Sequence, residues 1–252
     1  MLEISLAAEK IGAIGSLPIT NSLLTTWVVM AVLVIFSVLS TRKLAKVPGP
    51  LQSIAELVVG GLYEFFTSVV GKNVAQFFPL IASLFIYILI SNWIGLLPGV
   101  GTIGFHHEHA FLPLFRGPMA DLNATIALAL VSVIAMQYYG FKNVGAHYST
   151  RFLNFKDPIM FSVGILEIAS DISKIVSFAF RLFGNIFAGE VLLAVMAFLM
   201  PFLVPLPFLL MELFVGLIQA LVFSMLTAAF FNVAVSHGEE EHHAEGAVSH
   251  EA

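Results

Sequence analysis

The sequence contains no cysteine and few charged residues. The absence of cysteine among the 252 residues excludes disulfide bonds and thiol-based catalysis. Charged side chains make up 11% of the chain, against about 25% in an ordinary soluble domain. Hydrophobic residues make up 59%, and they form runs of about 20 residues, the length of a membrane-spanning helix rather than of a barrel strand. The composition therefore predicts an all-α integral membrane protein.

Other common signals are also missing. Residues 1–20 lack a basic segment followed by an apolar core, so we expect no cleavable signal peptide. No glycine-rich phosphate loop occurs, so we expect that the chain itself does not hydrolyse ATP, and nothing indicates nucleic-acid binding. No internal repeat is visible, which disfavours transporters built from two equivalent halves.

The apolar runs predict one membrane domain over residues 1–235 with about five spans. A further segment, about 51–70, is amphipathic and predicts a helix on the membrane surface. The run 159–200 would extend about 60 Å as a helix, twice a bilayer core of about 30 Å. That span must therefore tilt steeply, break or double back. The acidic, histidine-rich segment 236–252 predicts a disordered tail. The expected spans are about 21–40, 77–97, 122–141, 159–200 and 208–235.

The distribution of lysine and arginine predicts the orientation. Seven basic residues fall on the side reached after the first and third spans, and two fall on the other side. We therefore expect the N-terminus outside and the C-terminal tail in the cytoplasm of a bacterial inner membrane; an organelle membrane is the less favoured alternative. The seven are Arg42, Lys43, Lys46, Lys72, Lys142, Arg151 and Lys156, and the two are Lys10 and Arg116.

The long fourth span carries a polar stripe centred on Arg181. Glu167, Lys174 and Arg181 are spaced by seven and share one helical face, with Asp171 and Asn185 at its edge. A guanidinium stays protonated, and at a helix centre in lipid it costs about 2.5–3.5 kcal/mol by insertion scales. No acidic residue lies one turn from Arg181, so its partner is not supplied locally. Such a residue indicates a functional site.

A second polar set lies toward the other end of the same span. Glu190 follows Arg181 by nine residues and projects to the opposite side of the helix, so it must face another helix. The fifth span offers Glu212 and Gln219, seven residues apart on one face. The pattern predicts two offset routes, Glu190 with Glu212 near the outside and Glu167 with Asp171 near the inside, separated by Arg181.

Several of these residues also have simpler interpretations. Asp171 and Lys174, three apart, could be a local structural ion pair. Asn185 or Gln219 alone could hold two helices together by a hydrogen bond. Asp121 could cap the third span or belong to the outer route.

A metal centre is not expected. The only candidate ligand cluster is the histidine-rich loop 105–109, which lacks the i,i+4 helical arrangement of a zinc protease site, and we expect a solvated or route-lining loop. The sequence therefore predicts no metal and no other cofactor.

Residues 180–190, Phe-Arg-Leu-Phe-Gly-Asn-Ile-Phe-Ala-Gly-Glu, resemble the signature of subunit a of the F-type ATP synthase. Residues 121–125, Asp-Leu-Asn-Ala-Thr, also resemble the family, and length, span count and orientation agree. The resemblance implies a stator subunit packed against a c-subunit ring, with peripheral-stalk b subunits and the rest of the ATP synthase as partners in the lipid bilayer. It implies no catalysis by the chain itself.

The resemblance also implies roles for individual residues. Arg181 matches the arginine that faces the ring and prevents a proton short-circuit between two half-channels. Residues near the outer route and the ring interface are Asn185, Glu190 and Gln219, and Glu167 matches an acidic group of the inner route. Lys174 and Ser177 fall where the family places polar residues. The family often pairs a histidine with a glutamate at the positions of Glu190 and Glu212, whereas both are glutamate here.

The alternative interpretation is a stand-alone ion transporter or channel with an arginine-centred relay. The five spans without a repeat and the long fourth span weigh against it. The coupled ion, H⁺ or Na⁺, is not determined by these residues.

Overall fold

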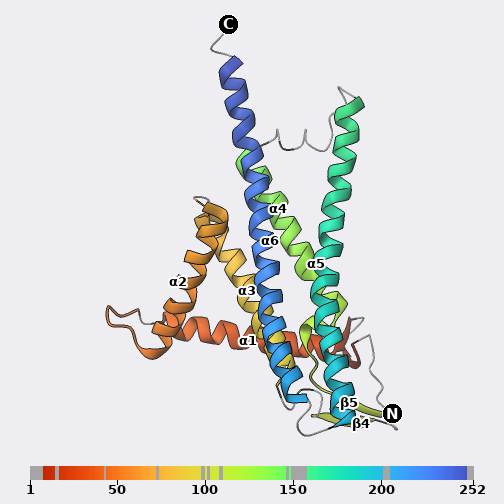
Figure 1. Ribbon diagram of the computed structural model, residues 1–252. Coiled ribbons are helices and arrows are strands. Elements are labelled where there is room, and N and C mark those ends of the chain that lie inside the picture. The colour runs from red at the N-terminus through yellow and green to blue at the C-terminus, as the bar shows by residue number, and fades with distance from the viewer. Residues whose placement is uncertain are drawn as a thin grey trace.

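Helices of very different length make up nearly all of the computed structural model (Figure 1). It describes residues 8–14, 17–42, 44–71, 74–97, 100, 103–107, 110–145, 148, 158–200 and 205–248. The helices are α1 (Asn21–Thr41), α2 (Pro50–Val70), α3 (Val74–Gly95), the short 3₁₀ helix η2 (Pro118–Ala120), α4 (Leu122–Val144), α5 (Pro158–Leu199) and α6 (Pro205–Val248). Two antiparallel hairpins join β1 (Lys10–Ile14) to β2 (Leu17–Thr20) and β4 (Gly104–His107) to β5 (Ala110–Pro113).

Local sequence explains where several helices begin and end. The Thr20 hydroxyl accepts a hydrogen bond from the backbone N–H of Leu23 and so caps α1. Asp121 caps α4 in the same way. Gly71 and Gly145 follow the ends of α2 and α4 with φ of 71° and 73°, a region in which residues other than glycine are strained.

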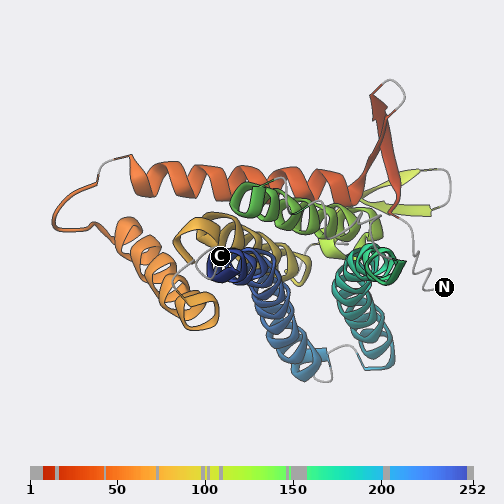
Figure 2. The same cartoon turned by 90° about the horizontal axis from the view of Figure 1, so that it is seen from above.

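The two longest helices run antiparallel and contact each other, and α1 runs across them rather than along them in both ribbon views (Figures 1 and 2). With 42 residues, α5 is about 63 Å long at 1.5 Å per residue. It is one continuous helix, so the possibilities that it breaks or doubles back are excluded. If α1, of 21 residues and about 31 Å, crosses the bilayer along its own axis, α5 and α6 must be steeply inclined.

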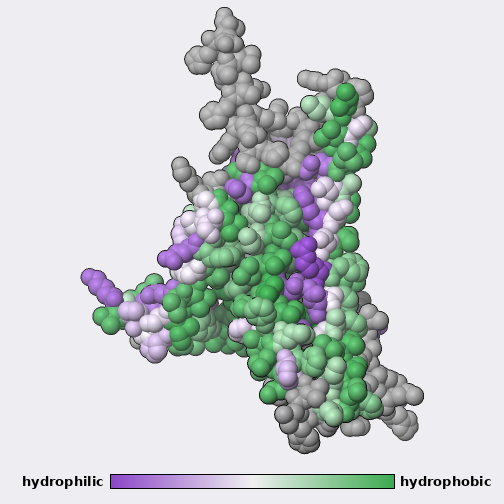
Figure 3. Space-filling model, viewed as in Figure 1, coloured by the Kyte–Doolittle hydropathy of each residue, from purple (hydrophilic) through white to green (hydrophobic). Residues whose placement is uncertain are grey.

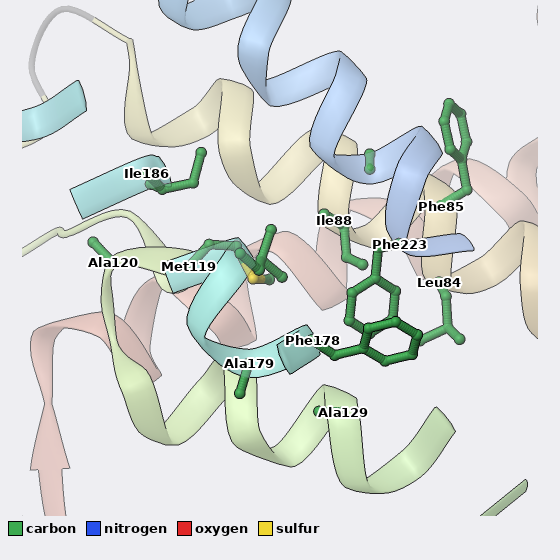
Figure 4. Close-up of a cluster of buried hydrophobic side chains, with 12 residues drawn as sticks. Leu84, Phe85, Ile88, Met119, Ala120, Ala129, Phe178, Ala179, Ile186 and Phe223 are labelled. Carbon is green, nitrogen blue, oxygen red and sulfur yellow. The ribbon is translucent and has the colours of Figure 1, made fainter. Parts of the chain in front are cut away.

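Apolar packing holds the long pair to the other helices. One cluster joins α3, α4, α5, α6 and η2, and in it the rings of Phe178 and Phe223 pack with centroids 4.9 Å apart (Figure 4). Fully buried alanines at 129, 179 and 220 let the helix backbones approach closely there. A second cluster, around Phe66, Phe77 and Phe231, joins α2, α3, α4 and α6. These clusters fix α5 and α6 relative to the rest of the chain.

The predicted fold class, an all-α membrane protein, is confirmed, with three differences in detail. By length and composition six helices could cross a membrane, because α2 qualifies as well. The two hairpins were not predicted, because their strands are only four or five residues long. Finally, α6 continues as helix to Val248, beyond the expected boundary at residue 235, and glutamate and alanine in this stretch are good helix formers.

Candidate proton-pathway site

Hydrophilic residues form a band along α5 beside α6, between hydrophobic surfaces, and further hydrophilic residues lie on the far side of the same view, toward α2 (Figure 3). Arg181 lies at the middle of α5, half-buried, and its Nη2 donates to the hydroxyl of Ser177 at 3.2 Å. Within the described part of the chain, no carboxylate lies within ion-pair distance of the guanidinium. Asn185 and Gln219 are half-buried on α5 and α6.

The carboxyl group of Glu212 is enclosed against the backbone of α5. Glu212 is only 4% exposed, and a Cβ added at Gly189 would lie 2.1–2.2 Å from its carboxyl atoms. No side chain fits between them, so glycine at position 189 allows the contact between α5 and α6. Gly189 was not among the predicted site residues, although it lies inside the signature segment.

Glu190 points away from the Arg181 stripe, as its spacing predicted, and meets the segment before η2. Its Oε2 lies 3.5 Å from Nη2 of Arg116, and a Cβ added at Gly117 would lie 3.4 Å from its Oε1. The Arg116 side chain is 11% exposed and that of Glu190 is 28% exposed. Sequence reasoning missed Arg116 because it is 74 residues away in the chain.

The two glutamates face a common cavity of about 10 Å³. α3 contributes Ser91 and Asn92 to its wall, and the backbone around Gly95 and Gly117 closes it. The predicted pairing of Glu190 with Glu212 thus corresponds to residues that the structure brings together. The contribution of α3 was not predicted, and its only signal was an asparagine within an apolar run.

Toward the start of α5 lies a charge-balanced cluster. Lys174 Nζ donates to Asp171 Oδ1 at 2.7 Å, which is the structural ion pair that the sequence analysis left open. The other carboxyl oxygen of Asp171 accepts from Gln137 Nε2 of α4 at 2.5 Å. Gln137 Oε1 in turn accepts from the Tyr148 hydroxyl at 2.9 Å. The cluster ties α5 to α4, and sequence reasoning missed Gln137 and Tyr148.

Two further predicted residues are Asp121 and Glu167. Asp121, 7% exposed, accepts a hydrogen bond from the Asn123 N–H at 3.0 Å and another from the Ser22 hydroxyl at 2.5 Å. This is the capping arrangement, one of the two alternatives for Asp121. Glu167 is half-buried on α5 and takes part in a further interaction.

The histidine-rich loop 105–109 is described only in part. Gly104–His107 form β4, whereas residues 108 and 109 and the side chains of His106 and His107 lie outside the description. Elsewhere in the described part of the chain, no three histidine or acidic residues are grouped as a metal site would require.

The sequence profile described as "ATP synthase A chain" matches residues 23–232. The chain belongs to the ATP synthase subunit a family. The family member of Geotalea daltonii is 36% identical over 216 residues, which cover 84% of this chain and 86% of that one. "ATP synthase subunit a" of Gloeobacter violaceus is 36% identical over 223 residues, with 88% and 86% covered. "ATP synthase subunit a 3" of Pelobacter propionicus is 38% identical over 220 residues, with 86% and 87% covered.

Membership confirms the family to which residues 180–190 and 121–125 pointed. A subunit a is a component of the ATP synthase and takes part in ion transport for ATP synthesis. With several helices apolar enough to cross a bilayer, the chain is a multi-pass membrane protein.

Proposed function

We propose that this chain is the proton-translocating stator subunit of a rotary ATP synthase, with two offset half-channels separated by Arg181. The observation that carries the proposal is the position of Arg181, on one continuous helix between two polar clusters, with no acidic partner among the described residues. A cation placed in this way is available to an acidic group on another subunit. We assign that acid to a carboxylate of a c-subunit ring.

The charges on either side of Arg181 support release of the proton by one route and uptake by another. A ring carboxylate beside Arg181 is favoured in its ionised form, because opposite charges attract strongly in a medium of low dielectric constant. Its proton leaves by the inner route, for which we propose Glu167. Past Arg181 the carboxylate is protonated again from the outer route, for which we propose Glu190 and Glu212, before it faces lipid, where an ionised carboxylate is costly. The guanidinium also repels a proton that would pass directly between the routes.

Other polar residues of the band have supporting roles in this proposal. Asn185 and Gln219, half-buried on facing helices, line the path between Arg181 and the outer glutamates. Ser177 orients the guanidinium through its hydrogen bond. Asp171 and Lys174 neutralise each other, so we assign them the positioning of α5 at the inner route.

The exposed surfaces of α5 and α6 support a membrane partner. On α5, Ile172, Val176 and Phe180 are 58%, 51% and 56% exposed, and on α6, Phe214 is 58% exposed. Apolar surface on helices that also carry a half-buried cation suits a ring of apolar helices that carry carboxylates. We further propose peripheral-stalk b subunits as partners and the cell inner membrane as the location, with the N-terminus outside and the C-terminus in the cytoplasm.

The decisive test is Arg181→Ala in the complete ATP synthase, reconstituted into lipid vesicles. We expect loss of ATP-driven proton pumping together with a faster passive proton leak, because both release and insulation depend on the guanidinium. Arg181→Lys keeps the charge but loses the planar donor fork, and we expect it to be severely impaired. Lys142→Ala, which removes an exposed positive charge at the end of α4, is the matched control. Pumping retained in Arg181→Ala would disprove the proposal, and transport by the chain reconstituted alone would favour a stand-alone transporter.

A further inference from the structure

A groove of about 740 Å³ lies between α1, α3 and α4, and none of the residues used in the proposed function lines it. The Ser22 hydroxyl donates to Asp121 and ties the start of α1 to the start of α4, and from there the two helices diverge (Figure 1). Small side chains, Ala124 and Ala127, face the space from α4. The volume of this α1–α4 groove falls within the range of roughly 300–1,000 Å³ of pockets that bury small-molecule ligands.

The wall of the α1–α4 groove changes from polar to apolar along its length. Apolar side chains line the deeper part, among them Met30, Leu84 and Val131. Two hydroxyls of the wall, those of Thr26 and Ser83, already donate to backbone carbonyls of their own helices. The groove therefore fits a molecule with one polar end and a long apolar part. Its mouth, at the starts of α1 and α4, is lined by four polar residues: Thr20, Ser22, Asp121 and Asn123.

The depth of the groove corresponds to one leaflet of a bilayer. On α1 its lining extends from Ser22 to Met30, which is about 12 Å along the helix at 1.5 Å per residue. If α1 crosses the bilayer along its own axis, this is close to half of a hydrocarbon core of about 30 Å, with the polar mouth at the surface of that leaflet. A helix of another subunit that spans the membrane would need a groove across both leaflets, whereas a lipid occupies only one.

A positive charge stands beside the mouth. Lys10 of β1 lies directly opposite Thr20 of β2, and side chains opposite each other in an antiparallel pair project from the same face. Thr20 lines the groove, and the Lys10 side chain is exposed. An ammonium group here is complementary to a phosphate group. The exposed amide of Asn123 adds two N–H donors for phosphate or ester oxygens.

We propose that the α1–α4 groove binds one phospholipid of the leaflet that lies at the start of α1. An acyl chain occupies the apolar part between α1, α3 and α4, and the phosphate lies at the mouth near Lys10. The lipid fills the space left where α1 diverges from α4, and so it joins α1 to the rest of the protein. This inference goes beyond the proposed function, since the groove holds no residue of the proton routes.

The first test is a map of the unmodified ATP synthase in nanodiscs of phosphatidylethanolamine and phosphatidylglycerol, at a resolution that shows lipid elsewhere in the complex. We expect one elongated density that follows the α1–α4 groove from Met30 to the mouth and ends in a phosphate peak near Lys10. A helix of another subunit in the groove would overturn the proposal, and so would an empty groove.

The second test fills the groove. Ala127→Phe places an aromatic ring in the space, and Ala31→Phe, at an exposed alanine of α1 outside the lining, is the matched control. We expect Ala127→Phe to lose the elongated density that the unmodified complex and Ala31→Phe retain. Unchanged density in Ala127→Phe would overturn the proposal. The two proposals fail separately, because Arg181→Ala should abolish pumping and leave the lipid density in place.

Discussion

Around Glu212, two carboxylates face a small cavity with polar atoms that lack a partner among the described residues, and Arg116 pairs with one of the two, Glu190, whereas around Asp171 one carboxylate faces one ammonium and each carboxyl oxygen has a donor. The outer cluster lies between α3, α5 and α6, and the inner cluster joins α5 to α4. Along α5, the two clusters lie on either side of Arg181. We interpret the difference as two uses of charge in one membrane protein. A neutral, fully bonded cluster fixes helices, and a cluster with an excess of acid and room for water is suited to moving protons.

The largest effect on transport is expected at the outer cluster. Glu212→Gln removes the exchangeable proton but keeps the shape, and we expect proton pumping to fall by roughly tenfold or more, since positioned proton-transfer groups contribute factors of about 10²–10⁴ in enzymes. Assembly of the complex should be unchanged. Glu64→Gln on α2, the same substitution at an exposed glutamate, is the control. Normal pumping in Glu212→Gln would mean that the outer cluster has no role in proton transport.

The next effect concerns the backbone that encloses Glu212. Gly189→Ala places a methyl group where the carboxyl atoms lie, at 2.1–2.2 Å, so α5 and α6 must move apart or the carboxylate must leave its site. We expect a loss of about 1–3 kcal/mol in stability, as for other overpacked interiors, with reduced yield of assembled complex. Gly60→Ala on α2, where nothing lies within 4 Å, is the control. Wild-type yield and pumping would show that the close contact is dispensable.

At the inner cluster, we expect stability to depend on whether Asp171 and Lys174 are paired, and not on the presence of an acid as such. Asp171→Asn leaves Lys174 without its carboxylate, and we expect a loss of about 1.5–3 kcal/mol, seen as lower thermal stability of the complex. Asp171→Asn combined with Lys174→Met removes both charges and should recover most of the stability, because neutral replacement of a buried pair costs little. The corresponding outer pair, Glu190→Gln with Arg116→Gln, should not recover transport. Recovery there would mean that both clusters are structural.

The features predicted from the sequence are those that depend on local pattern. The long apolar runs predicted the membrane helices, and the spacing of Glu190 from Arg181 predicted that it faces elsewhere. Arg116, Asn92 and Gly189 were missed because their roles depend on contacts between segments far apart in the chain, such as Asn92 with the carbonyl of Gly216, 124 residues away. Helical periodicity gives the face on which a residue lies but not the residue that it meets.

The smallest effect is expected at the edge of the inner cluster. Tyr148→Phe removes the hydroxyl that donates to Gln137 and keeps the ring, which packs against Gly140, where an added Cβ would lie 2.6 and 2.7 Å from two ring carbons. We expect a loss of about 0.5–1.5 kcal/mol in stability, the net value of one hydrogen bond, and unchanged proton pumping. Tyr138→Phe, at a side chain that is 61% exposed, should change neither. A pumping defect in Tyr148→Phe without loss of stability would place the inner cluster on the proton path, because the hydroxyl would then matter for transport and not for holding α4 to α5.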